Sequence, residues 1–382
     1  MSSVEMSDPT VARPGLLFLV LGLGFVLVTR LLLYVWMPDR TSDFDLLYDA
    51  AAQLARGGNP YSPATRGFLY PLPAALVAVP FTAIPLTLAR PIFDVLVGCA
   101  FVYALWRYRG PYALLAVMSG AYLFAMMNGQ TTPLMVAATL VPVLGFLLAV
   151  RPNTSASLWI AWPSLRALLG AGLFLVLSLV ALPSWPVDWW TALLQDNTQL
   201  VPPILRPFGF VLLLAALRWR TPEARLILAI TFIPQSTLPY ELVALALIPA
   251  SLLEMGVYVA GSWIAVAAWW YLSPGMAEWT ATGWPLTLCA VYLPMLYLML
   301  RRPNSVSEPG LKDRRRAQRL PDHELEVDIT TDGEGGVVVT VTHLPSQVSA
   351  TESGQTREIA SRKAHDKLAG ILAPMLRLKR TA

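Results

Sequence analysis

Residues 14–36 read PGLLFLVLGLGFVLVTRLLLYVW, an apolar run that carries a single charge at Arg30. A bilayer core about 30 Å thick requires roughly 20 consecutive apolar residues in a helix. The run is too long for a signal-peptide core and lacks a small-residue cleavage site, so it predicts a retained membrane span. Similar runs follow at 133–150, 165–182 and 256–272. Helices satisfy their own backbone groups in lipid, and the sequence therefore predicts an all-α polytopic membrane protein.

Composition supports this fold class. Hydrophobic residues make up 55% of the chain and charged residues 14%, whereas soluble domains carry about 25% charged residues. Helix lengths predict further spans at 88–107, 111–127, 130–150, 165–183, 203–218, 223–237, 239–254, 256–272 and 283–300. Residues 70–85 are apolar but hold four prolines, which predicts a broken or re-entrant segment.

Arginine bias predicts the sidedness of the spans. Clusters at 107–109, 151–166, 218–225 and 301–302 should share the cytoplasmic side. This arrangement gives about ten crossings with the N- and C-termini in the cytoplasm. It places residues 37–69, the turn 128–130, and residues 184–200, 235–241 and 273–284 outside.

The chain divides into four parts by composition. Residues 1–13 form a cytoplasmic N-terminus, and 14–302 the transmembrane domain with its first outer loop at 37–69. Residues 303–320 form a basic linker suited to anionic headgroups. Residues 321–382 predict a small α+β module of ββα type, with strands near 325–329 and 337–341 and an amphipathic helix over 359–378. The sequence does not identify a protein partner for this tail.

Several kinds of chemistry are excluded from the transmembrane domain, because every His and every Lys lies after residue 302. His-ligated metals, Ser-His-Asp hydrolysis and lysine Schiff bases therefore have no residues there, and we expect neither a metal nor a cofactor. Cys99 and Cys289 lie in apolar runs, where free cysteine packs as a small hydrophobe. The net charge of +4 reflects arginine at membrane ends, so we expect a lipid bilayer as partner and no nucleic acid.

Acidic residues gather in the first outer loop, at Asp39, Asp43, Asp45 and Asp49. A carboxylate at the mouth of a membrane cavity can act as general base towards a hydroxyl. Alternatively, these residues only solvate the polar face of an amphipathic helix over 44–56. Gly57 and Gly58 should end that helix.

The order of motifs after the first span resembles a known family. Asp43-Phe44, Leu47-Tyr48, Ala50-Ala51, Gly57-Gly58-Asn59-Pro60-Tyr61 and Tyr70-Pro71 follow one another, with Gly129-Gln130 and Arg151-Pro152-Asn153 further on. Together they resemble the polyprenyl-phosphate-sugar-dependent glycosyltransferases of the GT-C fold, in particular the bacterial mannosyltransferase-like group. That group has Asp-Phe-x-x-Tyr-Tyr-x-Ala-Ala, Tyr-Pro-Pro and often Lys-Pro-Gln at these places.

The resemblance implies a location in the bacterial inner membrane and an activity on the outer face. A sugar, with mannose favoured, would pass from a polyprenyl-phosphate donor to a hydroxyl of a glycolipid or glycan acceptor. Asp43 holds the position of the family's first-loop aspartate and would be the catalytic base, with Asp45 next in line. Arg206 is the first choice for binding the donor phosphate, followed by Arg40 and Arg66. An alternative of equal weight is that Arg206 binds no phosphate and extends its guanidinium to the lipid headgroups.

Further polar residues on the outer side are candidates for binding substrate. One prediction is an acceptor groove lined by Tyr48, Asn59, Tyr61 and Tyr70. The alternative is that the three tyrosines are interfacial anchors. Asn128 and Gln130 form a polar turn between two apolar runs, which should be buried or face a cavity. The remaining candidates are Tyr240 and Glu241.

Two other functions remain open from sequence. A transporter or lipid flippase would more often show repeated halves and charges near mid-span. A non-catalytic membrane scaffold would use the tail to recruit a partner and would not need Asp43. The gathering of acids in one loop, without a half-repeat, favours the enzyme.

Overall fold

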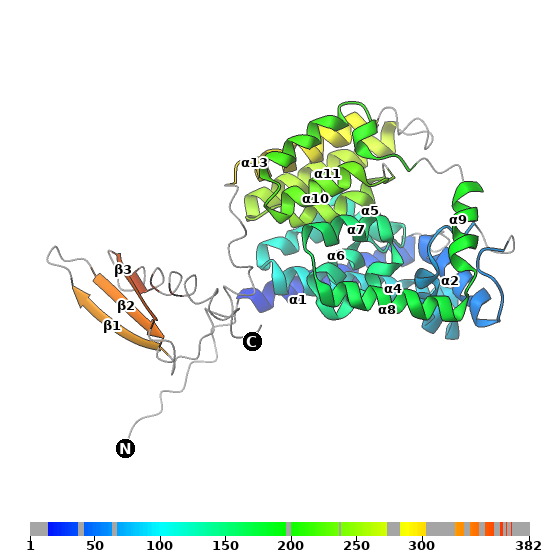
Figure 1. The fold of residues 1–382 in the computed structure, drawn as a ribbon, viewed down its shortest axis with the longest axis horizontal. Helices are drawn as coiled ribbons and strands as arrows, with labels where there is room; N and C mark the ends of the chain where they lie inside the picture. The colour runs from blue at the N-terminus through cyan, green and yellow to red at the C-terminus, as the bar shows by residue number, and fades with distance from the viewer. Residues whose placement is uncertain are drawn as a thin grey trace, which may run out of the picture. The chain divides into compact units, whose positions relative to one another are not determined.

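The computed structural model describes residues 14–36, 42–62, 67–195, 200–236, 238–272, 283–302, 325–331, 337–343 and 348–354, with 360, 361, 364 and 368. The predicted N-terminus 1–13 and basic linker 303–320 lie outside these residues. The chain divides into two compact units, Met1–Asn304 and Ser305–Ala382. Each unit is described by itself (Figure 1).

The first unit is helical and contains many short elements. Its α-helices are α1 (Pro14–Trp36), α2 (Asp43–Ala55), α3 (Leu72–Ala78), α4 (Leu86–Tyr108), α5 (Gly120–Met127), α6 (Thr132–Leu140), α7 (Pro152–Ala161), α8 (Leu165–Ala181), α9 (Trp185–Gln195), α10 (Pro222–Phe232), α11 (Leu252–Leu272) and α13 (Leu293–Leu300). Tighter 3-10 turns are η1 (Val79–Ala83), η2 (Pro111–Met118), η3 (Pro142–Val150), η4 (Pro203–Leu205), η5 (Gly209–Arg218) and η6 (Pro239–Leu247), and η7 (Leu288–Tyr292) is a π-helical turn.

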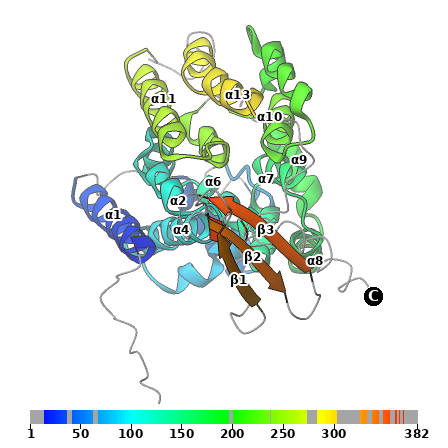
Figure 2. The same cartoon turned by 90° about the vertical axis from the view of Figure 1, so that its left-hand side faces the viewer.

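These helices form two groups with a layer between them. In both views α10, α11 and α13 lie together, and α1, α4 and α8 lie at the opposite side (Figures 1 and 2). Helices α5, α6 and α7 lie between the two groups. One buried apolar core runs through the unit, from Val26 in α1 to Met299 in α13.

Helix α2 confirms the predicted amphipathic helix. Ser42 and Asp45 form a capping box at its start, and the helix ends before Gly57, whose φ is +76°. Leu47, Ala50 and Ala51 on the apolar face are buried. The predicted break in 70–85 is also present: α3 ends at Ala78, the η1 turn follows, and α4 begins as a separate helix at Leu86.

Among the described residues, three helices are long and apolar enough to cross a membrane, namely Leu86–Tyr108, Leu252–Leu272 and Gly283–Leu300. A bent pair, α8 and α9 with an angle of 93° between them, gives a fourth if it counts as one span. Large apolar side chains such as Val180 (77%) and Leu253 (80%) are exposed, which suits a surface that faces lipid. The predicted ten crossings are not confirmed, because the runs at 111–127, 130–150 and 239–254 are broken into shorter pieces in the described chain.

The run 130–150 differs most from its prediction. A straight helix of that length would be about 30 Å long, which would place its ends at opposite sides of a membrane. Instead the chain turns at Val141, and the Arg151 guanidinium donates a hydrogen bond to the Gln130 side chain. The prediction that Arg151 lies across the membrane from Gln130 is therefore wrong. Close packing of η3 against α8 requires Gly145, where an added Cβ would lie 2.3 Å from the Ala167 Cα.

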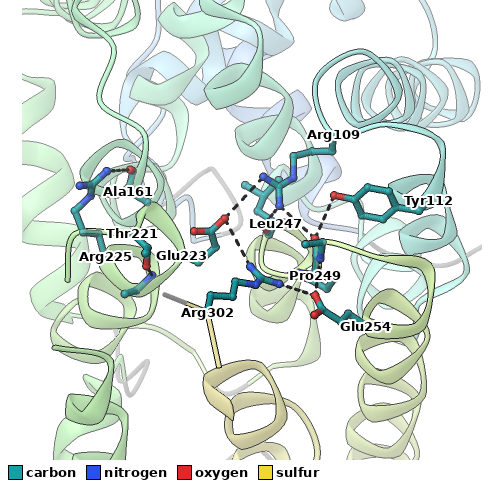
Figure 3. Close-up of polar contacts among 12 residues, drawn as sticks. Arg109, Tyr112, Ala161, Thr221, Glu223, Arg225, Leu247, Pro249, Glu254 and Arg302 are labelled. Atoms are coloured by element: carbon teal, nitrogen blue, oxygen red, sulfur yellow. Dashed lines mark hydrogen bonds and ion pairs between the residues drawn. The ribbon is translucent and has the colours of Figure 1, made fainter. Parts of the chain in front are cut away.

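Other arginines of the predicted cytoplasmic clusters do come together. Arg109 and Arg302 both approach Glu223, each at 3.9 Å, and Arg302 also pairs with Glu254 at 2.5 Å (Figure 3). Arg109 donates further to the carbonyls of Leu247 and Pro249. This cluster ties four segments of the chain together, and Glu254 has a structural role in it.

The second unit contains a three-stranded antiparallel sheet in the order β1 (Leu325–Thr331), β2 (Val337–His343), β3 (Val348–Gly354). The two predicted strands are confirmed, and the third was missed because its sequence VSATESG is largely polar. Val339, Val341 and Ala350 form a small core with Ala360, Ala364 and Leu368. These last three and residue 361 are helical, and the rest of the predicted helix 359–378 lies outside the described residues.

Candidate functional site

Asp43 is the first residue of α2 and lies against the turn between α5 and α6. Its backbone N–H donates to the carbonyl of Asn128 at 2.8 Å. Gly129 makes this approach possible, because its φ is +61° and an added Cβ would lie 3.0 Å from Ser42 and 3.2 Å from Phe44. The backbone contact therefore fixes the position of the start of α2 relative to the polar turn 128–130.

The Asp43 carboxylate accepts two hydrogen bonds on one oxygen. The Tyr70 hydroxyl and the Gln130 Nε2 both donate to Oδ2. Among the residues that the structure describes, Oδ1 accepts no hydrogen bond, and the side chain is partly exposed. Burial, reinforced by the Asp43 carboxylate, raises the pKa of Tyr70 and keeps its hydroxyl protonated as a donor. The carboxylate is oriented by two donors and retains one open oxygen.

The hydrogen bonds continue from Gln130 into the interior. Arg151 donates from Nη1 to Gln130 Oε1 and from Nη2 to Glu241 Oε1 at 2.7 Å. Its guanidinium also lies over the Tyr240 ring, 5.0 Å from the centroid. Gln130, Arg151 and Glu241 are 2%, 7% and 4% exposed. The predicted burial of the polar turn is therefore confirmed for Gln130, whereas Asn128 is partly buried. We call Asp43, Gln130, Arg151 and Glu241 the carboxylate relay.

Further hydroxyls support the inner end of the carboxylate relay. Ser236 Oγ lies 3.2 Å from Glu241 Oε1 and Thr154 Oγ1 lies 3.4 Å from Glu241 Oε2. A buried carboxylate is stable only when its charge is paired and its oxygens are hydrogen-bonded, and both conditions hold here.

Asp45 has a different environment from Asp43. It accepts from Ser42 N and Ser42 Oγ, both at 3.0 Å, and from Arg90 Nε and Nη2 at 2.9 and 2.8 Å. Its exposed fraction is 2%. The Ser42 bonds cap the start of α2, and the Arg90 bonds hold it to α4. Asp45 therefore has a structural role and is a poor second choice for a base.

The other predicted loop residues do not all meet at Asp43. The Tyr48 hydroxyl donates to the Ile84 carbonyl at 2.8 Å, away from the carboxylate relay. Asn59 Nδ2 donates to Asp188 of α9 at 2.8 Å, and the Tyr61 hydroxyl donates to the Tyr70 carbonyl at 3.0 Å. Asn128 uses its side chain to cap α5, at the Phe124 carbonyl. Of these four residues, Asn59 and Tyr61 shape the loop that carries Tyr70.

The predicted phosphate ligands give a mixed result. Arg206 is buried and donates to the carbonyls of Val201 and Gln235 at 2.9 and 2.6 Å, with its guanidinium 5.2 Å from the Trp284 ring centroid. It therefore neither snorkels nor presents its Nη2 to a ligand. Arg40 and Arg66 lie outside the described residues.

Sequence reasoning missed Arg151 as a member of the site. The signal was an arginine directly after an apolar run, which is also the usual mark of a membrane end. Among the described residues no group of three or more His, Cys, Asp or Glu is placed to hold a metal ion. Comparisons with protein-family models, with curated proteins and with solved structures find no match.

Proposed function

We propose that the chain is a membrane glycosyltransferase that transfers a sugar from a polyprenyl-phosphate donor to an acceptor hydroxyl, with Asp43 as general base. The proposal starts from the motif resemblance around residues 43–71. The observation that carries it further is the contrast between two aspartates on one helix end. Asp45 is fully engaged in structural bonds, whereas Asp43 is partly exposed and retains an open oxygen.

The reaction requires little more than a positioned base and a leaving group. The acceptor hydroxyl gives its proton to Asp43 Oδ1 while its oxygen bonds to the anomeric carbon of the sugar. The bond from that carbon to the phosphate oxygen breaks, and its electron pair leaves with the polyprenyl phosphate. Attack opposite the leaving phosphate inverts the configuration of the anomeric carbon. Tyr70 and Gln130 keep the carboxylate in the orientation that this transfer needs.

Apolar surface supports the choice of a lipid-linked donor. Residues on α8 and α11 expose large side chains that suit a bilayer, in which a polyprenyl chain can dissolve. The membrane location and the outer face of action are part of the proposal. A sugar on a lipid phosphate already carries a good leaving group, so a nucleotide-binding domain is not required.

The test is transfer of radiolabelled mannose from polyprenyl-phosphate-mannose to membrane glycolipids. Wild type is compared with Asp43→Asn at matched expression, and Glu254→Gln serves as a control at the arginine cluster of Figure 3. Loss of a general base should lower the transfer rate by about 10²- to 10⁴-fold. Equal transfer by Asp43→Asn and wild type would exclude Asp43 as the base. No transfer by wild type from any polyprenyl-phosphate sugar would exclude the activity.

A transporter or flippase is the second candidate because of one buried ion pair. Arg30 of α1 and Asp94 of α4 pair at 2.7 Å, with side chains 4% and 1% exposed. Charged residues within membrane helices often mark transport paths. Lipid flipping by the purified chain in vesicles, unaffected by Asp43→Asn, would favour this candidate over the enzyme.

A further inference from the structure

The Gln130 amide occupies a position between two groups of opposite hydrogen-bonding character. The Asp43 carboxylate on one side only accepts, and the Arg151 guanidinium on the other side only donates. An amide has one accepting and one donating end, so only one of its two orientations satisfies both neighbours. In that orientation Nε2 faces Asp43 and Oε1 faces Arg151.

Arg151 is in turn fixed by Glu241. The distance from Nη2 to Oε1 is 2.7 Å, and both side chains are at least nine-tenths buried. Charge-assisted hydrogen bonds of this kind are short and directional, and the Tyr240 ring below the guanidinium restricts it further. Glu241, which follows Arg151 by 90 positions in the chain, therefore sets the orientation of the Gln130 amide through Arg151.

From this geometry we propose that Arg151 and Glu241 are positioning residues for the base, which act by holding the Gln130 amide with its N–H toward Asp43. The inference rests on the proposed function for its catalytic consequence. Its structural content, the direction of the amide, is independent of any reaction. Neither Arg151 nor Glu241 touches the reacting atoms in this scheme.

A charge-reversed double variant, Arg151→Glu with Glu241→Arg, separates positioning from simple ion pairing. Each single variant leaves a buried charge without its partner and should lower the apparent melting temperature. The double variant restores the pair and should recover most of that loss. However, the carboxylate at position 151 now attracts the N–H end of Gln130, so the amide turns and presents its oxygen to Asp43. We expect transfer to stay about 10- to 100-fold below wild type, with the KM for donor little changed.

Recovery of transfer together with the melting temperature would show that the pair is only structural and would overturn the proposal. The neutral pair Arg151→Met with Glu241→Met serves if the reversed pair does not fold. It removes the buried charges but leaves the amide unoriented, and it should also keep a folded protein with reduced transfer.

A stability measurement tests the amide direction even if wild type transfers no sugar. Gln130→Leu removes the amide at similar volume and is placed in the wild-type and the charge-reversed backgrounds. In wild type it should lower the melting temperature, because two good hydrogen bonds are lost. In the charge-reversed background Gln130→Leu should leave the melting temperature unchanged or raise it, because the substitution removes an amide oxygen that faces the Asp43 carboxylate. An equal decrease in melting temperature in both backgrounds would overturn the proposal. If the decreases differ but wild type transfers no sugar, only the glycosyltransferase function is rejected.

Discussion

Asp45→Asn tests the division of roles at the start of α2. The substitution replaces one carboxylate oxygen by an NH2 group, which then faces donors. If Oδ2 is the replaced atom, the bonds from Ser42 N at 3.0 Å and Arg90 Nη2 at 2.8 Å are lost. Each hydrogen bond to a charged group contributes about 1.5–3 kcal/mol. Because the Arg90 side chain is 15% exposed, water compensates part of this loss, and we expect a net cost of about 2–4 kcal/mol.

The assay is thermal unfolding of the purified protein in detergent, followed by circular dichroism. A cost of this size should lower the apparent melting temperature by about 4–10 °C. Asp43→Asn is the matched control on the same helix end, and it should shift the melting temperature by less than about 2 °C, since Asn can accept both donors at Oδ1. Equal shifts in the two variants, or no shift in Asp45→Asn, would refute the division into a structural and a functional aspartate.

Three further predictions concern the turn and the tyrosines around Asp43. Gly129→Ala should lower the free energy of unfolding by about 1–2 kcal/mol, because alanine is strained at φ +61° and its Cβ meets Ser42. The measurement is the melting temperature, and an unchanged value would contradict this geometry. Tyr70→Phe removes one donor to Asp43 and should lower kcat about tenfold with little loss of stability, so a variant with wild-type kcat would show that the hydroxyl is dispensable. Burial, with Asp188 nearby, raises the pKa of Tyr61 above its usual 10.0, so its contribution to stability is complete below pH 10 and is lost as pH rises towards the folded-state pKa. Denaturation at pH 8 and pH 11 should show a smaller pH-dependent loss in Tyr61→Phe than in wild type, and equal losses would argue against burial of this hydroxyl.

Local patterns sufficed to predict the elements that depend on nearby residues. Helix α2 could be predicted because its start, apolar face and glycine stop all lie within residues 42–58. Burial of Gln130 followed from a polar turn between apolar runs. The two valine-rich strands of the tail were equally clear, whereas the polar strand β3 takes its place by pairing with β2 along the whole of 337–343.

The pairings that build the candidate site were beyond local patterns. An arginine after an apolar run indicates a membrane end, and only the fold shows that Arg151 turns inward to Glu241. The different roles of Asp43 and Asp45 depend on Arg90, which lies 45 positions from Asp45. One signal was available: Ser42 and Asp45 have the spacing of a capping box, which predicts that Asp45 is engaged.

The pairing of Arg151 with a glutamate 90 residues later constrains how the chain is made. A ribosome adds about 5–20 residues each second, so Arg151 exists for roughly 5–20 s before Glu241 is synthesised. During that interval the guanidinium lacks the carboxylate with which it pairs directly, and the segment around it is best stabilised where water still reaches it. Final burial of residues 142–151 should therefore wait for the η6 segment. Nascent chains arrested after residue 200 should expose a cysteine placed at Ala149 to a water-soluble thiol reagent, and chains arrested after residue 300 should protect it.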